Sequence, residues 1–303
     1  MATLLDFVRL SRPVFLLGGF LLFALGVGVA RAGGYAVRMP TYLLGQIAVT
    51  FTQLLTHYLN EIHDLEPDRL NNARTFWTGG SGILPSGRIP VSIATRAAQL
   101  CLAISTAAVV ILVVTAQMNV TAGIVYGVIL LGVWAYSNPP LRLLSTGWGE
   151  IEAAIVVAGL TPAFAYALAA GALSGTLFAV VTPLVVIQFA VLIMYDIPDF
   201  EADAAGGKHT LVVRLGVRKS GLIGAAALSL AGLLLAGLGW VLGLAPANAA
   251  TVLAPIPLAV LAGWFLLHAA ALRTEQYGWF VFAGVALSAA TMVALTAAFW
   301  LAG

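Results

Sequence analysis

The chain has 303 residues, of which 61% are hydrophobic and only 9% are charged. Soluble domains carry roughly 25% charged residues, so this composition excludes a soluble globular protein and indicates one that crosses a membrane several times. The formal net charge of +2 gives no indication of a nucleic-acid partner, and the single cysteine, Cys101, excludes both a disulfide framework and a cysteine-based metal site.

Stretches without Asp, Glu, Lys or Arg predict the membrane-spanning helices, because a bilayer core of about 30 Å requires about 20 apolar residues. Residues 13–30 and 39–60 each accommodate one span. Residues 97–141, 153–195 and 220–272 are each long enough for a helical hairpin, the last one broken near Pro246 and Asn248, and residues 276–303 form a final span. The sequence therefore predicts an all-α membrane protein of nine transmembrane helices around a central cavity, in a single domain over residues 1–303.

The first apolar stretch has a second interpretation as a cleavable signal peptide. Arg9 and Arg12 precede it, and Ala-Arg-Ala follows at residues 30–32. The apolar run of residues 13–30 is longer than the 7–15 residues usual for a signal peptide. A retained helix is therefore favoured, and cleavage would leave the remaining helices unchanged.

Charge is distributed unevenly between the two faces that this topology creates. The face that receives the N-terminus holds all the Lys and Arg residues except Arg31 and Arg38, and it also holds every Asp and Glu. The positive-inside rule makes this face cytoplasmic, in a cell membrane. The chemistry of the protein, and the opening of the cavity, are expected there.

Two acidic motifs stand at the ends of long apolar stretches on this face. The first is NEIHDLEPD, residues 60–68, and the second is DIPDFEAD, residues 196–203. At an offset of 135 residues they share the pattern [E/D]-I-x-D-[L/F]-E-x-D. Helical spacing puts the Asn and Asp side chains of each motif on one face, and these residues are Asn60, Asp64 and Asp68, with Asp196, Asp199 and Asp203.

Carboxylates packed side by side at a membrane edge repel one another, so such an arrangement is expected to bind a cation. An acidic helix end is often no more than a solvated surface, but the repeat favours a shared site. Ligands that are all oxygens select a hard ion such as Mg²⁺, which typically uses one or two carboxylates plus the phosphates of a substrate. The two motifs therefore predict metal ions that bridge a diphosphate, with Arg74, Arg142 and Lys208 as further countercharges.

A glycine-containing loop follows each motif, at residues 78–88 and 204–210. Glycines allow backbone N–H groups to approach phosphate closely, so both loops are expected to cap the site. The remaining polar residues of these segments are expected to be solvated, and they are Glu66, Glu201, His63 and His209.

These motifs resemble those of the UbiA superfamily of intramembrane aromatic prenyltransferases. Residues 60–68 resemble its first aspartate motif, N-D-x-x-D-x-x-x-D, and residues 196–216 resemble its second motif with the following G-K-x-T. Residues 11–26 resemble the opening helix of the family. YSNPPLRLLSTGWGE, residues 136–150, resembles a segment of the 1,4-dihydroxy-2-naphthoate polyprenyltransferase branch. Glu61 stands where the first motif normally has Asp, and Asp196 replaces an Asn common in that branch.

The resemblance implies a Mg²⁺-dependent transfer of a polyprenyl group from its diphosphate to an aromatic acceptor within the bilayer, as in menaquinone or other quinone biosynthesis, and no obligate protein partner. It implies that the six Asn and Asp residues named above hold the metal, with Asp64 and Asp199 essential to the reaction. Lys208 and Arg142 match basic residues that bind the departing diphosphate or an acidic group of the acceptor.

An allylic cation formed in such a reaction is stabilised by aromatic faces. Candidates near the same helix ends are Tyr136 and Tyr195, with Tyr58 and Trp134. Alternative functions are a membrane terpene cyclase, or transfer to another ring such as homogentisate, 4-hydroxybenzoate, a chlorophyll precursor or haem. A cation-coupled transporter is disfavoured because the acids lie at one membrane edge rather than in mid-helix. The D-G-x-x-A-R signature of phosphatidyltransferases is absent.

Overall fold

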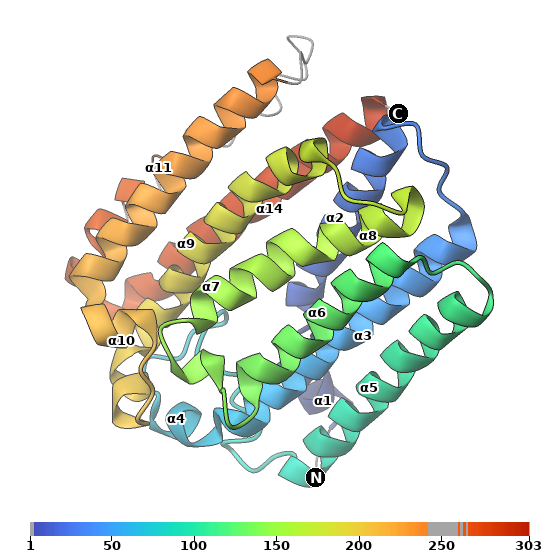
Figure 1. Ribbon diagram of the computed structural model, residues 1–303. Helices are drawn as coiled ribbons and strands as arrows, with labels where there is room; N and C mark the ends of the chain where they lie inside the picture. The colour runs from blue at the N-terminus through green and yellow to red at the C-terminus, as the bar shows by residue number, and fades with distance from the viewer. Residues whose placement is uncertain (1–2, 242–259, 261–262, 265, 303) are drawn as a thin grey trace.

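The computed structural model describes residues 3–241, 260, 263–264 and 266–302, and within these residues the protein is all-helical (Figure 1). The long helices are α2 (Pro13–Ala32), α3 (Met39–His63), α5 (Val91–Val114), α6 (Val120–Ser137), α9 (Gly175–Ala205), α11 (Val217–Val241) and α14 (Tyr277–Ala302). The shorter helices are α1 (Leu4–Ser11), α4 (Leu65–Leu70), α7 (Gly149–Ala154), α8 (Thr161–Ala170) and α10 (Leu211–Leu215). A π-helix, η2 (Ile155–Leu160), joins α7 to α8, and the 3₁₀ turns are η1 (Leu143–Ser145), η3 (Ala269–Ala271) and η4 (Thr274–Gln276).

Seven of the described helical segments are long and apolar enough to cross a membrane, which confirms a polytopic membrane protein. Helix α3 is not among the seven, although its 25 residues are long enough to span. It is more polar because one of its faces, including Thr52, Gln53 and His57, lines a cavity. The break predicted near Pro246 and Asn248 lies outside the described residues, so the predicted count of nine stays a prediction.

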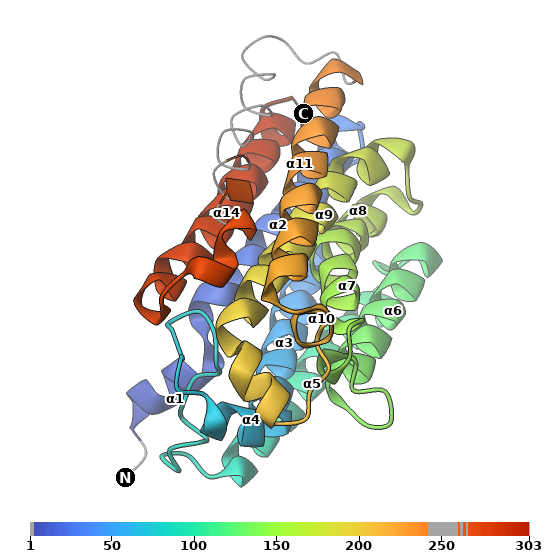
Figure 2. The ribbon, with the colours of Figure 1, turned by 90° about the vertical axis from the view of Figure 1, so that its left-hand side faces the viewer.

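Helix α9 is the centre of the bundle. It packs against α2, α4, α7, α8, α11 and α14 (Figures 1 and 2). With 31 residues it is about 46 Å long at 1.5 Å per residue, which exceeds the thickness of a bilayer core. Its last turns, residues 196–203, carry the second acidic motif and remain packed in the bundle through Ile197, Pro198 and Ala202.

The two acidic motifs lie at the same end of the molecule. Helices α4 and α10 both contact α9 there, and α4 directly follows the end of α3 (Figure 1). We call this the acidic end. Helix α1 belongs to it as well, and exposes Leu4, Leu5 and Val8 while its buried side packs on α3. This arrangement brings segments that are more than a hundred residues apart in the sequence to one region.

Candidate active site

A cavity of about 440 Å³ lies among α2, α3, α6, α7, α9 and α14. Its lining at the acidic end is polar, whereas its deeper walls include Leu21, Val49, Ile129, Val191 and Met292. Nine of the residues proposed from sequence line it, and they are Asn60, Asp64, Asp68, Tyr136, Tyr195, Asp196, Asp199, Asp203 and Lys208. The cavity therefore joins a charged mouth to an apolar interior.

The spacing of the first acidic motif predicts one continuous helix, but the structure divides it between two helices. Helix α3 ends at His63 and α4 begins at Leu65, with Asp64 as the cap between them. Pro67 has no N–H group, and its ring excludes the carbonyl of His63 four residues earlier. That carbonyl accepts a hydrogen bond from Nη2 of Arg142 at 3.2 Å instead. Arg142 therefore braces the bend and does not line the cavity, while its buried Nε has no hydrogen-bond partner. Its predicted contact with substrate stays a prediction.

The bend nevertheless preserves the helical register of the motif. The N–H of Asp64 donates to the carbonyl of Asn60 at 2.8 Å, and the N–H of Asp68 donates to the carbonyl of Asp64 at 2.9 Å. The three side chains consequently face the cavity together. The Oδ1 atom of Asn60 accepts a hydrogen bond from Oγ of Ser137 at 2.7 Å, which orients the amide from α6.

Lys208 joins the two motifs. Its Nζ lies 2.9 Å from Oδ2 of Asp64 and 3.1 Å from Oδ1 of Asp203, and its side chain is only 10% exposed. Burial alone would lower the pKa of this ammonium, but the two carboxylates outweigh burial and raise it above its ordinary value. Lys208 is therefore a fixed cation between the acids of α3 and α9.

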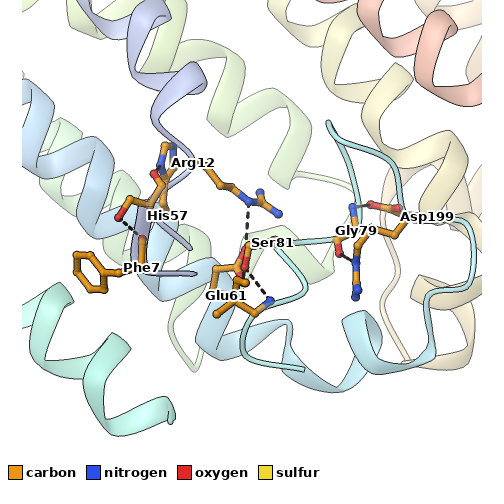
Figure 3. A network of polar contacts seen from close by, with 10 residues as sticks. Phe7, Arg12, His57, Glu61, Gly79, Ser81 and Asp199 are labelled. Carbon is orange, nitrogen blue, oxygen red and sulfur yellow. Dashed lines mark hydrogen bonds and ion pairs between the residues drawn. The ribbon is translucent and has the colours of Figure 1, made fainter. Parts of the chain in front are cut away.

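The loop after the first motif holds Asp199 of the second motif (Figure 3). Nδ2 of Asn71 donates to Oδ1 of Asp199 at 2.7 Å, and the N–H of Gly79 donates to Oδ2 at 2.9 Å. Gly79 has a positive φ of 77°, a conformation that favours glycine. The predicted capping role of this loop thus takes the form of N–H donation to a carboxylate at the cavity wall.

Arg74 maintains the shape of this loop and does not line the cavity. Its Nε donates to the carbonyl of Gly79 at 2.5 Å, and its Nη2 donates to the backbone carbonyl of Asp68 at 2.6 Å. The structure therefore gives Arg74 a bracing role within the loop, and its predicted contact with substrate stays a prediction.

Asp68 is buried beside other acids. Burial, and then the charges of Asp64 and Glu61, raise the pKa of its carboxyl to about 7. The loop also approaches it so closely that a Cβ on Gly80 would collide with Oδ2 of Asp68. In the absence of a bound cation the ionised form of Asp68 is therefore disfavoured.

Asp196 differs from the other acids because its carboxyl group lies near another one, that of Glu150 at the start of α7. Oε1 of Glu150 accepts the N–H of Leu211 at 2.6 Å, and this contact anchors the beginning of α10. Asp196 is thus linked to the packing of α7 and α10 as well as lining the cavity.

Arg12 and Glu61 form a second charged pair at the cavity, which the sequence did not reveal (Figure 3). Nε of Arg12 lies 3.1 Å from Oε1 of Glu61, whose side chain is 1% exposed. Both carboxylate oxygens of Glu61 also accept hydrogen bonds from Ser81, one from its N–H and one from its Oγ, at 2.6 Å. The only signal in the sequence is that Glu61 belongs to the first acidic motif. Its carboxylate fixes the loop and not a metal.

Four aromatic side chains line the mouth and the adjoining wall, and two of them were expected. Tyr136 and Tyr195 are joined by Phe15 and Trp77. Phe15 packs edge-on against both Tyr195 and Trp77, with ring centroids 6.0 Å apart in each pair. These aromatic faces surround the region immediately below the acids.

The other two aromatic candidates lie elsewhere. Tyr58 is buried, with its hydroxyl 2.7 Å from Oγ of Ser11, and Trp134 is 45% exposed on the outside of α6. Neither lines the cavity. Glu66 and Glu201 are exposed, in agreement with the expectation that they are solvated.

The acidic end has the chemistry required for a hard divalent ion. Oδ1 of Asp64 is buried and has no hydrogen-bond partner, and the neighbouring ligands are carboxylate and amide oxygens. In the part of the chain described, no three His, Cys, Asp or Glu side chains are arranged to hold an ion by themselves. An ion such as Mg²⁺ fits these residues when a phosphate group completes its coordination.

Comparison with known proteins agrees with this geometry. The UbiA prenyltransferase family matches residues 20–282. A structure described as digeranylgeranylglyceryl phosphate synthase superposes with a TM-score of 0.68 at 18% identity, covering 99% of this chain and 100% of that one. A UbiA homologue from Archaeoglobus fulgidus bound to GPP and Mg²⁺ gives 0.65 at 16% identity, covering 97% and 99%. One from Aeropyrum pernix K1 gives 0.66 at 17% identity, covering 90% and 97%.

A search of curated protein sequences gives no match. The structural likenesses are too distant in sequence to show more than the fold, but the family match covers most of the chain. The chain therefore belongs to the UbiA prenyltransferase family and is a membrane-embedded prenyltransferase.

Proposed function

We propose that this protein transfers a polyprenyl group from a polyprenyl diphosphate to an aromatic acceptor, a quinone precursor such as 1,4-dihydroxy-2-naphthoate, in a reaction that depends on Mg²⁺. One observation carries the proposal. The two acidic motifs line the polar mouth of a single cavity whose deeper walls are apolar. A diphosphate requires the first environment and a polyprenyl chain requires the second. The A. fulgidus homologue bound to GPP and Mg²⁺ supports a prenyl diphosphate and Mg²⁺ as the ligands.

In this proposal, the residues that would hold Mg²⁺ together with the diphosphate are Asn60, Asp64, Asp68, Asp199 and Asp203. When bound, the metal would stabilise the negative charge that develops as the allylic C–O bond breaks. Lys208 contributes a further positive charge, because its ammonium already lies between Asp64 and Asp203. Asp196 is a peripheral ligand, since its carboxyl group faces Glu150.

The aromatic side chains below the acids protect the reactive end of the prenyl group. Tyr136, Tyr195 and Phe15 present ring faces or edges to the cavity, and such groups stabilise an allylic cation. They also exclude water, which would otherwise capture the cation. The electron-rich ring of the acceptor then attacks the terminal carbon of the prenyl group, and the ring loses a proton or a carboxylate.

We also propose that the acidic end faces the cytoplasm of a cell membrane. Of the basic residues, only Arg31 and Arg38 belong to the opposite side of the predicted topology. This distribution follows the positive-inside rule.

The test uses purified protein in lipid nanodiscs with Mg²⁺, a labelled prenyl diphosphate and 1,4-dihydroxy-2-naphthoate, homogentisate or 4-hydroxybenzoate. A prenylated ring should appear in the lipid-soluble fraction. Asp64→Ala and Asp199→Ala should each abolish its formation, whereas Glu201→Ala should retain it, because Glu201 is exposed on the same helix. Diphosphate release without any prenylated ring would refute transfer to an aromatic acceptor and favour a cyclase. Near-normal turnover in either Asp variant would refute the metal site.

A further inference from the structure

Glu152 is an acidic residue inside a membrane-spanning segment, and none of the roles described above involves it. It lies on α7, in the span that covers residues 149–170, and its side chain lines the cavity. Its Oε1 atom is buried and has no hydrogen-bond partner. Oε1 packs against Gly132 of α6, and the side chain as a whole is partly exposed to the cavity. A carboxyl group within a membrane-spanning segment is costly to keep when no protein donor satisfies it. Its presence therefore calls for a ligand that donates a hydrogen bond.

The helix that carries Glu152 is shaped to present it to the cavity. Glu152 and Val156, four residues apart, both line the cavity, as expected for one face of an α-helix. Ala153 and Val157 line the cavity as well, and the next lining residue is Thr161, which follows the π-helix η2. These residues form one stripe along the cavity wall, and π-turns often occur at functional sites.

Gly132 on α6 provides the space that the carboxyl group occupies. A Cβ at this position would lie 2.5 Å from Oε1 of Glu152 and 2.8 Å from Cγ2 of Val156. Gly132 comes five residues before Ser137, whose hydroxyl contacts Asn60, so it lies about 7 Å deeper along α6. Glu152 is thus about one to two helical turns below the acids at the mouth, beside the region where the end of the prenyl group would lie.

The two basic side chains that line the cavity, Arg12 and Lys208, form salt bridges with acids other than Glu152. Lys208 pairs with Asp64 and Asp203, and Arg12 pairs with Glu61. No salt bridge within the described residues involves Glu152. The carboxyl group is therefore separate from the diphosphate-binding end both in depth and in its partners.

We propose that Glu152 binds the aromatic acceptor by accepting a hydrogen bond from a hydroxyl group on its ring, and so selects hydroxylated rings. The proposal rests on the function proposed above. A carboxylate that accepts this bond increases the electron density of the ring and fixes the ring carbon that faces the prenyl group. Glu152 is accordingly a specificity-determining residue that contacts the acceptor, whereas the acids at the mouth contact the diphosphate.

The test compares a hydroxylated probe with its methyl ether. Binding of 1-naphthol and 1-methoxynaphthalene to the full-length protein in nanodiscs is measured with Mg²⁺ and a non-hydrolysable prenyl diphosphate analogue present. The quantity compared is the ratio of the dissociation constant of 1-methoxynaphthalene to that of 1-naphthol. In the wild type this ratio should be at least about ten, since a hydrogen bond to a charged group contributes that much or more. Glu152→Leu should reduce the ratio to about one, and Glu152→Gln should give an intermediate ratio. The KM for prenyl diphosphate should stay within about twofold in both variants.

Two further variants complete the design. Gly132→Ala should also lower the ratio, because its methyl group occupies the place of the Glu152 carboxyl. Glu66→Gln removes an exposed carboxylate that pairs only with Arg69, and should leave the ratio unchanged. An unchanged ratio in Glu152→Leu, a wild-type ratio near one, or a more than tenfold rise in the KM for prenyl diphosphate in Glu152→Gln would each overturn the proposal.

The same experiment separates this proposal from the proposed function. Prenylated product from the wild type together with an unchanged ratio in Glu152→Leu defeats the role of Glu152 alone. A ratio that depends on Glu152, without a prenylated product from any acceptor, upholds the hydroxyl site and defeats the proposed reaction.

Discussion

Replacement of Lys208 by methionine should destabilise the metal-free protein markedly. The change keeps the length of the side chain but removes the ammonium that lies 2.9 Å from Asp64 and 3.1 Å from Asp203. Both carboxylates are largely buried, with side-chain exposures of 19% and 8%. Loss of one partner from a buried ion pair typically costs about 3–5 kcal/mol, because the remaining charge is left uncompensated.

The loss of stability in Lys208→Met should be fully present at neutral pH. The pKa of Lys208 is raised above its ordinary value of 10.5, so its stabilising contribution is complete below pH 10.5 and is lost only as the pH rises through the higher folded value. The assay is the thermal unfolding midpoint of detergent-solubilised protein at pH 7.5, followed by tryptophan fluorescence. Lys219→Met, which removes an exposed lysine, is the matched control and should leave the midpoint unchanged.

Mg²⁺ should restore more stability to Lys208→Met than to the wild type. In the variant the unpaired carboxylates of Asp64 and Asp203 are free to bind the ion, and an ion that binds only the folded state stabilises it by mass action. The double variant Asp203→Asn, Lys208→Met should recover part of the loss, because only one carboxylate is then left unpaired. Equal midpoints for wild type and Lys208→Met without Mg²⁺, or equal Mg²⁺ responses, would refute the view of Lys208 as the resident countercharge.

Three further changes test the surroundings of the site. Asp68→Asn should raise the unfolding midpoint of the metal-free protein at pH 8 more than at pH 5, by the equivalent of about 2–3 kcal/mol. The reason is that a folded pKa of about 7, against 3.8 when unfolded, makes stability fall as the pH rises through this interval; a pH-independent difference would contradict it. Asn71→Ala removes a donor to Asp199 and should raise the KM for prenyl diphosphate several-fold, with kcat changed less, in steady-state kinetics. An unaltered KM would show that the hydrogen bond from Asn71 does not position Asp199 for the diphosphate. Glu61→Gln weakens the contacts with Arg12 and Ser81, so limited proteolysis should cut the loop 78–88 faster than in the wild type; equal cleavage rates would show that Glu61 does not hold this loop.

The membrane-spanning character and the pairing of the acidic motifs can be predicted from the sequence, because each leaves a pattern in the order of residue types. Long uncharged stretches define spans, and the offset repeat at residues 60–68 and 196–203 selects two helix ends of equal orientation. Contacts that depend on one bent backbone are not readable in this way. The donation from Arg142 to the carbonyl of His63 exists only because Pro67 frees that carbonyl. The motif match predicts that Arg142 contacts the substrate, but it does not predict this contact with the bend.

The role of Glu61 and the exposure of Glu152 to the cavity were missed for a related reason. Glu61 belongs to the acidic motif by position, yet its partners Arg12 and Ser81 come from other segments. Glu152 follows a family-like segment, but the position of its carboxyl group depends on the space left by Gly132 on α6. Long-range packing decides which of several acids faces a ligand, and neither spacing nor composition contains that information.

The partners of the acids predict how the metal enters the site. Asp64 and Asp203 share Lys208, and Asp199 accepts hydrogen bonds from Asn71 and Gly79. Because these groups already neutralise much of the charge, Mg²⁺ alone should bind weakly, with a millimolar dissociation constant in titration calorimetry. Mg²⁺ added with a prenyl diphosphate should bind far more tightly, since the phosphate oxygens supply the missing ligands. Tight binding of Mg²⁺ alone to the wild type, at micromolar concentrations, would show that the acids form a complete metal site without the diphosphate and would contradict this order of assembly.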